Sequence, residues 1–214
     1  MAKNTATQLL DVAERLFASQ GFDGVSIASI ADELGLTKQA LLHHFGSKEA
    51  LFGAVLQRIS DQFQLLLVPP QAEQVNAAQQ LEMRLLELYR AIRLKPAQSQ
   101  LLMRELLDNN RRAASAKRWY LKPLLLQLMA CVRDAPAWAK ADDAQALALV
   151  YQLLGAINYF AISKPTLEGI FGDEAYAALD IVFEQQLRGL ISAALASSPA
   201  PSASSDGLSI NPQM

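Results

Sequence analysis

The sequence predicts an all-α protein of about nine helices, arranged as a small N-terminal three-helix unit and a larger helical body. Apolar residues recur at three- and four-residue spacing along most of the chain, and the strict alternation of β-strands is almost absent. Of the 214 residues 51% are hydrophobic, which is enough to bury a sizeable core. Many of the few proline and glycine residues fall where helices are expected to end.

The first expected helix covers about residues 5–20. One apolar stripe follows it, made of Leu9, Val12, Ala13, Leu16 and Phe17. We expect Gly21 to take the left-handed conformation that ends a helix, with Phe22 folding back onto Phe17.

Residues 26–45 predict a helix-turn-helix. Ser26 and Thr37 are favourable caps for two short helices, and Gly35 suits the tight turn between them. The first helix would bury Ile27, Ile30, Ala31 and Leu34, and the second would bury Leu41 and Phe45. A helical wheel places Gln39 and His43 opposite Leu41, toward solvent. A short helix with such a small polar outer face fits a DNA major groove about 12 Å wide.

The remaining elements follow from caps and breakers. Ser47 caps a long helix that Pro69 and Pro70 end. Further helices are expected at 72–94, 98–108, 111–133, from Asp142 or Asp143 to about 163, and at 173–196, with a loop from Pro165 to Gly172. We therefore predict a helix-turn-helix DNA-binding domain at 1–46, a helical ligand-binding and dimerisation domain at 47–196, and a disordered Ser/Pro/Ala-rich tail at 197–214.

The charge does not by itself favour a nucleic-acid partner. The net charge is −2, and residues 1–60 hold five basic and six acidic side chains. DNA-binding domains usually carry a basic excess. The helix N-termini at Ser26 and Thr37 can hold phosphate groups without one, since their backbone N–H groups point outward.

Several motifs at fixed spacing resemble the tetracycline-repressor (TetR) family of regulators, over about residues 8–56. They are Ala13-Glu-Arg-Leu-Phe17, Gly21-Phe22, Gly35-Leu36-Thr37-Lys38, His43-His44-Phe45 and Ser47-Lys-Glu-Ala-Leu51. The resemblance implies an N-terminal DNA-binding domain and a C-terminal domain that dimerises and binds a small molecule. By the family pattern the DNA-facing residues are Ser26, Thr37, Lys38, Gln39, Leu42, His43, His44 and Lys48.

Two positions depart from that pattern. Members of the family often carry Arg where this chain has Ala28, and Tyr where it has Leu42. Both departures weaken direct contact with DNA. They leave Gln39 as the best candidate for reading a base, by a bidentate contact with adenine.

The last two expected helices carry more apolar residues than one buried stripe requires. The resemblance implies that they pair across a two-fold axis into a four-helix seam. The expected interface residues are Leu153, Ile157, Leu179, Val182, Phe183, Leu187 and Leu190. Burial within one subunit is the alternative, and we favour a homodimer.

A ligand pocket, if the chain has one, is expected among the helices of residues 72–163. Candidate lining residues are Tyr89, Met103, Arg104, Trp119, Tyr120, Tyr151, Asn158 and Tyr159. Each of them alone is better explained as core. The basic stretch from Arg104 to Lys122 is read first as a solvated helix face, and second as capture of an anionic head group. The expected ligand is small, apolar or amphipathic, with an anionic group as the open alternative.

Other chemistry finds little support. Cys131 is read as a buried inert thiol, with a redox sensor as the alternative. Adjacent His43 and His44 point about 100° apart on a helix, so we expect no metal site there, and no cofactor is predicted. The N-terminus lacks a secretory signal and no run reaches the ~20 apolar residues of a membrane span, so we expect a cytoplasmic protein that does not enter a membrane.

The predicted function is that of a sequence-specific DNA-binding transcriptional regulator, a repressor that a small molecule releases from a palindromic operator. One alternative is a DNA-bound adaptor that recruits a protein partner. Another is an all-helical enzyme or lipid-binding module that merely contains a helix-turn-helix-like hairpin. Catalysis is disfavoured because both histidines lie in the helix-turn-helix and no nucleophile or phosphate-loop motif is present.

Overall fold

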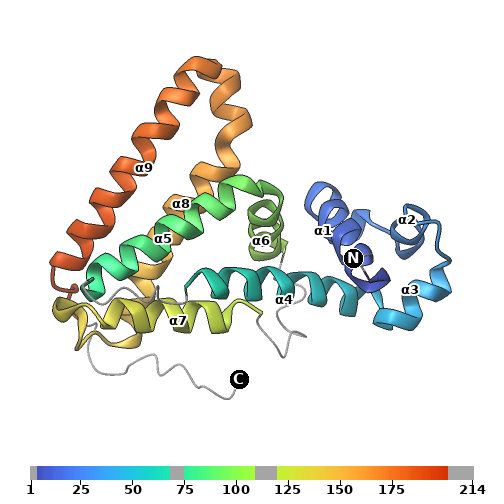
Figure 1. The fold of residues 1–214 in the computed structure, drawn as a ribbon, viewed down its shortest axis with the longest axis horizontal. Helices are drawn as coiled ribbons and strands as arrows, with labels where there is room; N and C mark the ends of the chain where they lie inside the picture. The colour runs from blue at the N-terminus through green and yellow to red at the C-terminus, as the bar shows by residue number, and fades with distance from the viewer. Residues whose placement is uncertain (1–3, 68–74, 109–119, 202–214) are drawn as a thin grey trace. The chain divides into compact units, whose positions relative to one another are not determined.

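The structure, a computed structural model, describes residues 4–67, 75–108 and 120–201, and these residues contain helices and no β-strand. The all-α prediction is confirmed. The helices are α1 (Thr5–Gly24), α2 (Ile27–Asp32), α3 (Lys38–Phe45), α4 (Lys48–Leu66), α5 (Ala77–Leu94), α6 (Pro96–Asp108), α7 (Lys122–Arg133), α8 (Asp143–Phe171) and α9 (Asp173–Ala196), with a 3-10 turn at Pro136–Trp138 (Figure 1).

The chain divides into two compact units that are not simple halves of the sequence. The first unit joins residues 1–62 with 95–121, and the second joins 63–94 with 122–214. Most of α4 and all of α6 therefore belong with the N-terminal helices, beyond the predicted boundary at residue 46. The assignment of DNA binding to 1–46 and of ligand binding and dimerisation to 47–196 stays a prediction, and most of the predicted tail lies outside the described residues.

The first unit is built around an aromatic cluster. The ring of Phe52 on α4 makes edge contacts with Phe17 and Phe22, each at 5.0 Å between centroids. Gly21 has the expected positive φ of 76°. It kinks α1 instead of ending it, and one more turn follows to Gly24. The kink turns Phe22 back so that its ring stacks on Phe17, as predicted.

Polar contacts attach α6 and α4 to α1. Arg58 on α4 donates to Asp11 at 2.8 Å and to Glu14 at 2.6 Å. The amide of Gln98 on α6, which is buried, donates to Glu14 at 2.9 Å and to Gln62 at 3.0 Å. Because a buried amide must find partners, this network holds the start of α6 at one place along α1.

The second unit is formed by α5, α7, α8 and α9. The two longest helices, α8 and α9, run antiparallel and meet at a sharp corner (Figure 1). The helix α5 packs against α7, α8 and α9, and α7 packs against α8. The core includes Leu85, Leu128, Leu153 and Ile157, all buried.

The predicted loop from Pro165 to Gly172 is wrong. The helix α8 continues through Pro165 to Phe171. Proline removes one backbone donor, but the helix survives because later bonds persist: the N–H of Gly172 donates to the Glu168 carbonyl at 2.8 Å, and Lys164 pairs with Glu168 across the proline. Gly172, with a φ of 84°, is the residue that ends α8.

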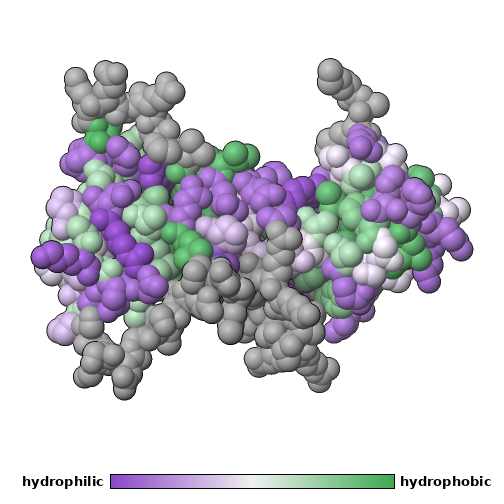
Figure 2. All heavy atoms as spheres, turned by 90° about the horizontal axis from the view of Figure 1, so that it is seen from below, coloured by the Kyte–Doolittle hydropathy of each residue, from purple (hydrophilic) through white to green (hydrophobic). Residues whose placement is uncertain are grey.

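The surface mixes polar and apolar residues, and hydrophobic and hydrophilic side chains are interspersed on the face drawn in Figure 2. Among the described helices, α8 is long and apolar enough to cross a membrane by length and composition, with a mean hydropathy of 1.5. Core helices of globular proteins pass the same test. Only 39% of the apolar stretch of α8 is buried within the chain, so much of the apolar surface of this helix is exposed.

Candidate nucleic-acid interface

The helix α2 is fixed by reciprocal bonds at its first turn. The hydroxyl of Ser26 accepts from the Ser29 N–H at 2.9 Å, and the Ser29 hydroxyl accepts from the Ser26 N–H at 3.2 Å. Ile30 and Ala31 are fully buried. Sequence reasoning identified the Ser26 cap, and the structure adds Ser29 as its partner in a capping box.

The helix α3 is oriented by one cap and one core residue. The Thr37 hydroxyl accepts from the Ala40 N–H at 3.1 Å, as its predicted cap role requires. Leu41 is fully buried, and Gly46 with a φ of 78° ends the helix. Gly35, at a φ of 65°, makes the turn between α2 and α3. The two helices pack on each other as a helix-turn-helix.

The face of α3 opposite Leu41 is open to solvent. Of the predicted DNA-facing residues, Ser26, Thr37, Lys38, Gln39, His43 and His44 are exposed, while Leu42 and Lys48 are half-buried. The rings of His43 and His44 stand nearly perpendicular, with centroids 6.0 Å apart. This face can approach a nucleic acid without displacing core side chains.

Lys48, at the first residue of α4, is partly held by an aromatic ring. Its ammonium lies 4.3 Å from the ring centroid of Phe22 on α1. A cation over an aromatic face keeps its charge while its stem is ordered. Across the same domain, Arg15 on α1 pairs with Glu33 just after α2. The first contact ties α4 to α1, and the second ties the end of α2 to α1.

The predicted pocket residues are divided between the two compact units. Met103, Arg104 and Tyr120 belong to the first unit, whereas Tyr89, Tyr151, Asn158 and Tyr159 belong to the second. Trp119 lies outside the described residues. Arg104 is exposed and donates to the Ser19 carbonyl at 3.4 Å, so its contact is with the end of α1.

Of the predicted pocket residues in the second unit, some lie in the core and others lie on the surface. Tyr89 is fully buried, and its hydroxyl donates to Asp180 at 3.3 Å. Burial, followed by the Asp180 charge, raises the pKa of the Tyr89 phenol. Tyr151 and Tyr159 are instead 50% and 72% exposed, and the half-buried Asn158 amide donates to the Leu154 carbonyl.

The predicted interface residues are likewise divided between buried and exposed positions. Leu153, Ile157 and Leu187 are buried inside the unit, which is the alternative left open above. Phe183 is half-buried and stacks on Phe160 with 3.8 Å between ring centroids. Leu179, Val182 and Leu190 are exposed on α9 and recur at spacings that place them on one face of that helix.

Sequence reasoning missed part of this apolar surface. Tyr151 and Tyr159, assigned to a pocket, flank the exposed Gly155 at four-residue spacing along α8. Ile181 on α9 is 65% exposed. The four-residue repeat of Tyr, Gly and Tyr was the signal that could have placed these residues on one outer face.

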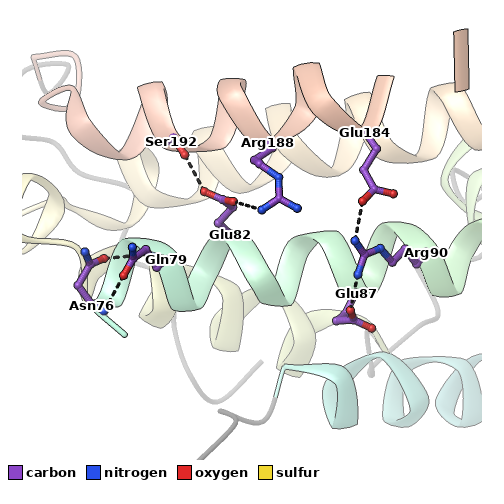
Figure 3. A network of polar contacts seen from close by, with 8 residues as sticks. All are labelled: Asn76, Gln79, Glu82, Glu87, Arg90, Glu184, Arg188 and Ser192. Atoms are coloured by element: carbon purple, nitrogen blue, oxygen red, sulfur yellow. Dashed lines mark hydrogen bonds and ion pairs between the residues drawn. The ribbon is translucent and has the colours of Figure 1, made fainter. Parts of the chain in front are cut away.

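Ion pairs fix α9 against α5. Figure 3 shows Arg188 and Ser192 of α9 both bound to Glu82, and Arg90 of α5 bound to Glu184 at 2.6 Å. The Arg90 hydrogen bond holds the pKa of the Glu184 carboxyl below its ordinary value. The first turn of α5 is capped in the same view, by reciprocal bonds between Asn76 and Gln79.

The segment that contains the helix-turn-helix is similar to known proteins. Residues 9–55, which contain α2 and α3 whole, match the family model described as bacterial regulatory proteins of the tetR family. Over these residues, about a fifth of its length, the chain is similar to that family. The HTH-type transcriptional repressor KstR2 of Rhodococcus jostii strain RHA1 is 40% identical over 55 residues, 26% of this chain and 27% of the relative. The match thus spans about a quarter of that relative's length.

Longer similarities extend past the N-terminal domain. The transcriptional regulator RutR of Escherichia coli strain K12 is 28% identical over 171 residues, 77% of each chain. The structure of a putative tetR family transcription regulator from Shewanella sp. PV-4 aligns with a TM-score of 0.64 at 17% identity, over 93% of this chain and all of that one. Salmonella enterica GusR aligns with the same TM-score at 22% identity, over 90% and 95% of the two chains. The fold of this chain is therefore similar to the folds of these two proteins over most of its length.

Proposed function

We propose that this chain is a sequence-specific DNA-binding transcriptional regulator of the TetR type that acts as a repressor. The observation that carries the proposal is the open face of α3, which exposes Gln39 and His43 while Leu41 anchors the helix in the core. The relatives matched over this segment include the repressor KstR2. The names of these relatives support repression over activation.

On DNA, α3 is the recognition helix. Its exposed side chains are short or polar, so the helix can enter the major groove. Gln39 presents an amide to base edges, and Thr37 and Lys38 lie at the helix N-terminus, where phosphates are favoured. With Ala28 and Leu42 in place of stronger contacts, base contacts are few and phosphate contacts supply much of the affinity.

Two copies of the chain act together. The exposed apolar residues of α8 and α9, which include Tyr159, Val182 and Leu190, are proposed to pack against a second copy. A two-fold dimer would present two α3 helices to a pseudo-palindromic operator, with half-sites about 34–36 Å apart or at a multiple of that spacing. The same contact would cover the apolar surface of α8.

We further propose that a small molecule controls DNA binding. A ligand that binds better to a dimer with wrongly spaced α3 helices lowers operator affinity by its differential binding energy, typically about 1–3 kcal/mol. The protein is proposed to act in the cytoplasm on operator DNA, and neither catalysis nor a membrane-bound state is part of the proposal.

A gel-shift experiment tests the proposal. The full chain is titrated against genomic fragments that include its own promoter, with excess competitor DNA at physiological salt. We expect at least one fragment to be bound selectively, since specific sites are bound at least about a thousandfold more tightly than random DNA. Uniform binding to every fragment would exclude a sequence-specific regulator. Recruitment of a partner protein without any response to small molecules would favour the adaptor alternative.

A further inference from the structure

The second unit buries one arginine among leucines. Arg84 on α5 is only 6% exposed. It lies on the same helix face as Leu81, Leu85 and Leu88, all of which are buried in the core. Arginine is almost never fully buried unless it is paired, because its charge cannot be neutralised by losing a proton. The position of Arg84 therefore requires partners inside the unit.

The partners that the structure provides do not satisfy the guanidinium. One terminal nitrogen, Nη2, donates to the Gln80 amide at 3.3 Å, and the other, Nη1, donates to the Cys131 sulfur at 2.7 Å. The buried Nε has no hydrogen-bond partner. Within residues 4–67, 75–108 and 120–201, no carboxylate pairs with Arg84. By contrast, Arg90 and Arg93 on the same helix both pair with acidic residues of α9.

Cys131 does not supply the missing negative charge. Burial raises the pKa of its thiol, the Arg84 charge and hydrogen bond act in the opposite direction, and Asp134 raises it further. The net direction is upward, so the group is a neutral thiol at neutral pH. Asp134 itself is exposed at the end of α7. Among the described residues, the buried Arg84 charge is thus left without a counter-charge.

We propose that Arg84, with Gln80 and Cys131 beside it, binds the carboxylate of an otherwise apolar small molecule in the second unit. A guanidinium presents its donors as a planar fork that matches a carboxylate. The sulfur of Cys131 lies 2.7 Å from Nη1, so a carboxylate that binds there has to displace it. The carboxylate oxygen would replace the sulfur at Nη1.

The surroundings define the rest of the ligand. Leu124, Leu128 and Met129 of α7 are buried, and so are the leucines of α5 that flank Arg84. One charged group among buried apolar residues of two packed helices favours an amphipathic monocarboxylate over a polar sugar or a nucleotide. The inference rests on the ligand control proposed above and names the chemical class of the ligand.

Calorimetric titration of the full chain without DNA tests it. The probes are straight-chain carboxylates from butanoate to tetradecanoate and benzoate, each compared with the alcohol of the same skeleton. We expect at least one carboxylate to bind wild type about tenfold or more tightly than its alcohol, as a hydrogen bond to a charged group implies. In Arg84→Met the two should bind within about twofold of each other. Arg90→Met, a change of an exposed arginine on the same helix, should keep the preference.

The melting temperature without ligand separates a binding role from a structural one. Arg84→Met should melt at or above the wild-type temperature, because it replaces an uncompensated buried charge with an apolar side chain of similar length. If the variant gives no cooperative melt, Arg84→Lys replaces it in the titration. A weakened preference there supports the proposal, and an undiminished one overturns it.

Two results overturn the proposal outright. One is a wild-type protein that binds no carboxylate of the series more tightly than its alcohol, and the other is an Arg84→Met variant that keeps the preference. Neither result bears on operator recognition, because the titration contains no DNA. Failure of the gel shift with intact carboxylate binding would instead count against the regulator proposal alone.

Discussion

At the scale of single residues, Gln39 carries the sequence selectivity that we assign to α3. Its side chain is exposed, and the neighbouring Ala40 and Leu42 cannot hydrogen-bond a base. We expect Gln39→Ala to reduce discrimination against a changed base in each half-site by about 1–3 kcal/mol. Affinity for non-specific DNA should hardly change. Competition gel shifts with singly substituted operators measure both quantities.

The matched control for this prediction is Gln20→Ala, a change of an exposed glutamine on α1. It should leave operator preference intact. An unchanged preference in Gln39→Ala would remove Gln39 as the base reader and shift attention to Lys38 and His43.

Residue patterns predicted the recognition unit well because its signals are local. The caps Ser26 and Thr37, the glycine turn and the buried Leu41 depend on neighbours within a few positions. Arg84 was missed for the opposite reason. It lies on an apolar stripe, and sequence cannot tell whether its long side chain reaches solvent or ends against a residue such as Cys131, 47 positions away.

At the scale of elements, the pairing of α5 with α9 should depend on pH. The folded pKa of Glu184 lies below its ordinary value of 4.5 because Arg90 donates to it. The pair therefore stabilises the fold fully above that value, and its contribution is lost as the pH falls through the folded pKa. The pair is partly exposed to solvent, so the effect should not exceed about 1 kcal/mol.

Urea unfolding at several pH values checks this expectation. Wild type should be more stable than Glu184→Gln at neutral pH, and the difference should shrink on acidification. In an Arg90→Met background the same glutamine substitution should have little effect at any pH. A difference that is constant with pH, or one that persists without Arg90, would contradict the assignment.

The prediction of α8 shows where rules for single elements fail. A proline predicts a helix end because it lacks a donor and restricts the residue before it. In α8 the cost at Pro165 is outweighed by neighbouring contacts: Lys164 pairs with Glu168 and lies over the ring of Tyr176 on α9. Contacts between helices decided the boundary, and they are not visible in the local sequence.

At the scale of the whole molecule, the proposed dimer depends on the exposed apolar residues of α9. We expect the double substitution Val182→Glu and Leu190→Glu to produce a monomer, because it would bury unpaired carboxylates in the contact. Operator affinity should fall strongly, since each half-site then binds alone. Sedimentation velocity gives the oligomeric state, and gel shifts give the affinity.

Leu94→Glu provides the control, because Leu94 is 84% exposed at the end of α5. That variant should behave as wild type in both measurements. A double variant that stays dimeric would show that the apolar surface of α9 serves another contact.

The sequence did not predict which helices pack together in each compact unit. The all-α class followed from periodicity, but the return of α6 to the first unit depends on Gln98 and Glu14, which are 84 positions apart. A periodic pattern shows that a helix has a buried face, and it does not show which helix covers that face. Sequence therefore located the helix-turn-helix more accurately than the boundary of the unit that contains it.

The attachment of α6 to α1 has a consequence for protein engineering. The compact unit that carries the helix-turn-helix is assembled from two separate stretches of chain, 1–62 and 95–121. A fragment that ends at residue 62 would lack Gln98, whose side-chain amide donates hydrogen bonds to Glu14 and Gln62. A chimaeric regulator that joins this DNA-binding unit to the ligand-binding domain of another protein would need two junctions. The helix α6 would have to be transferred together with the N-terminal helices.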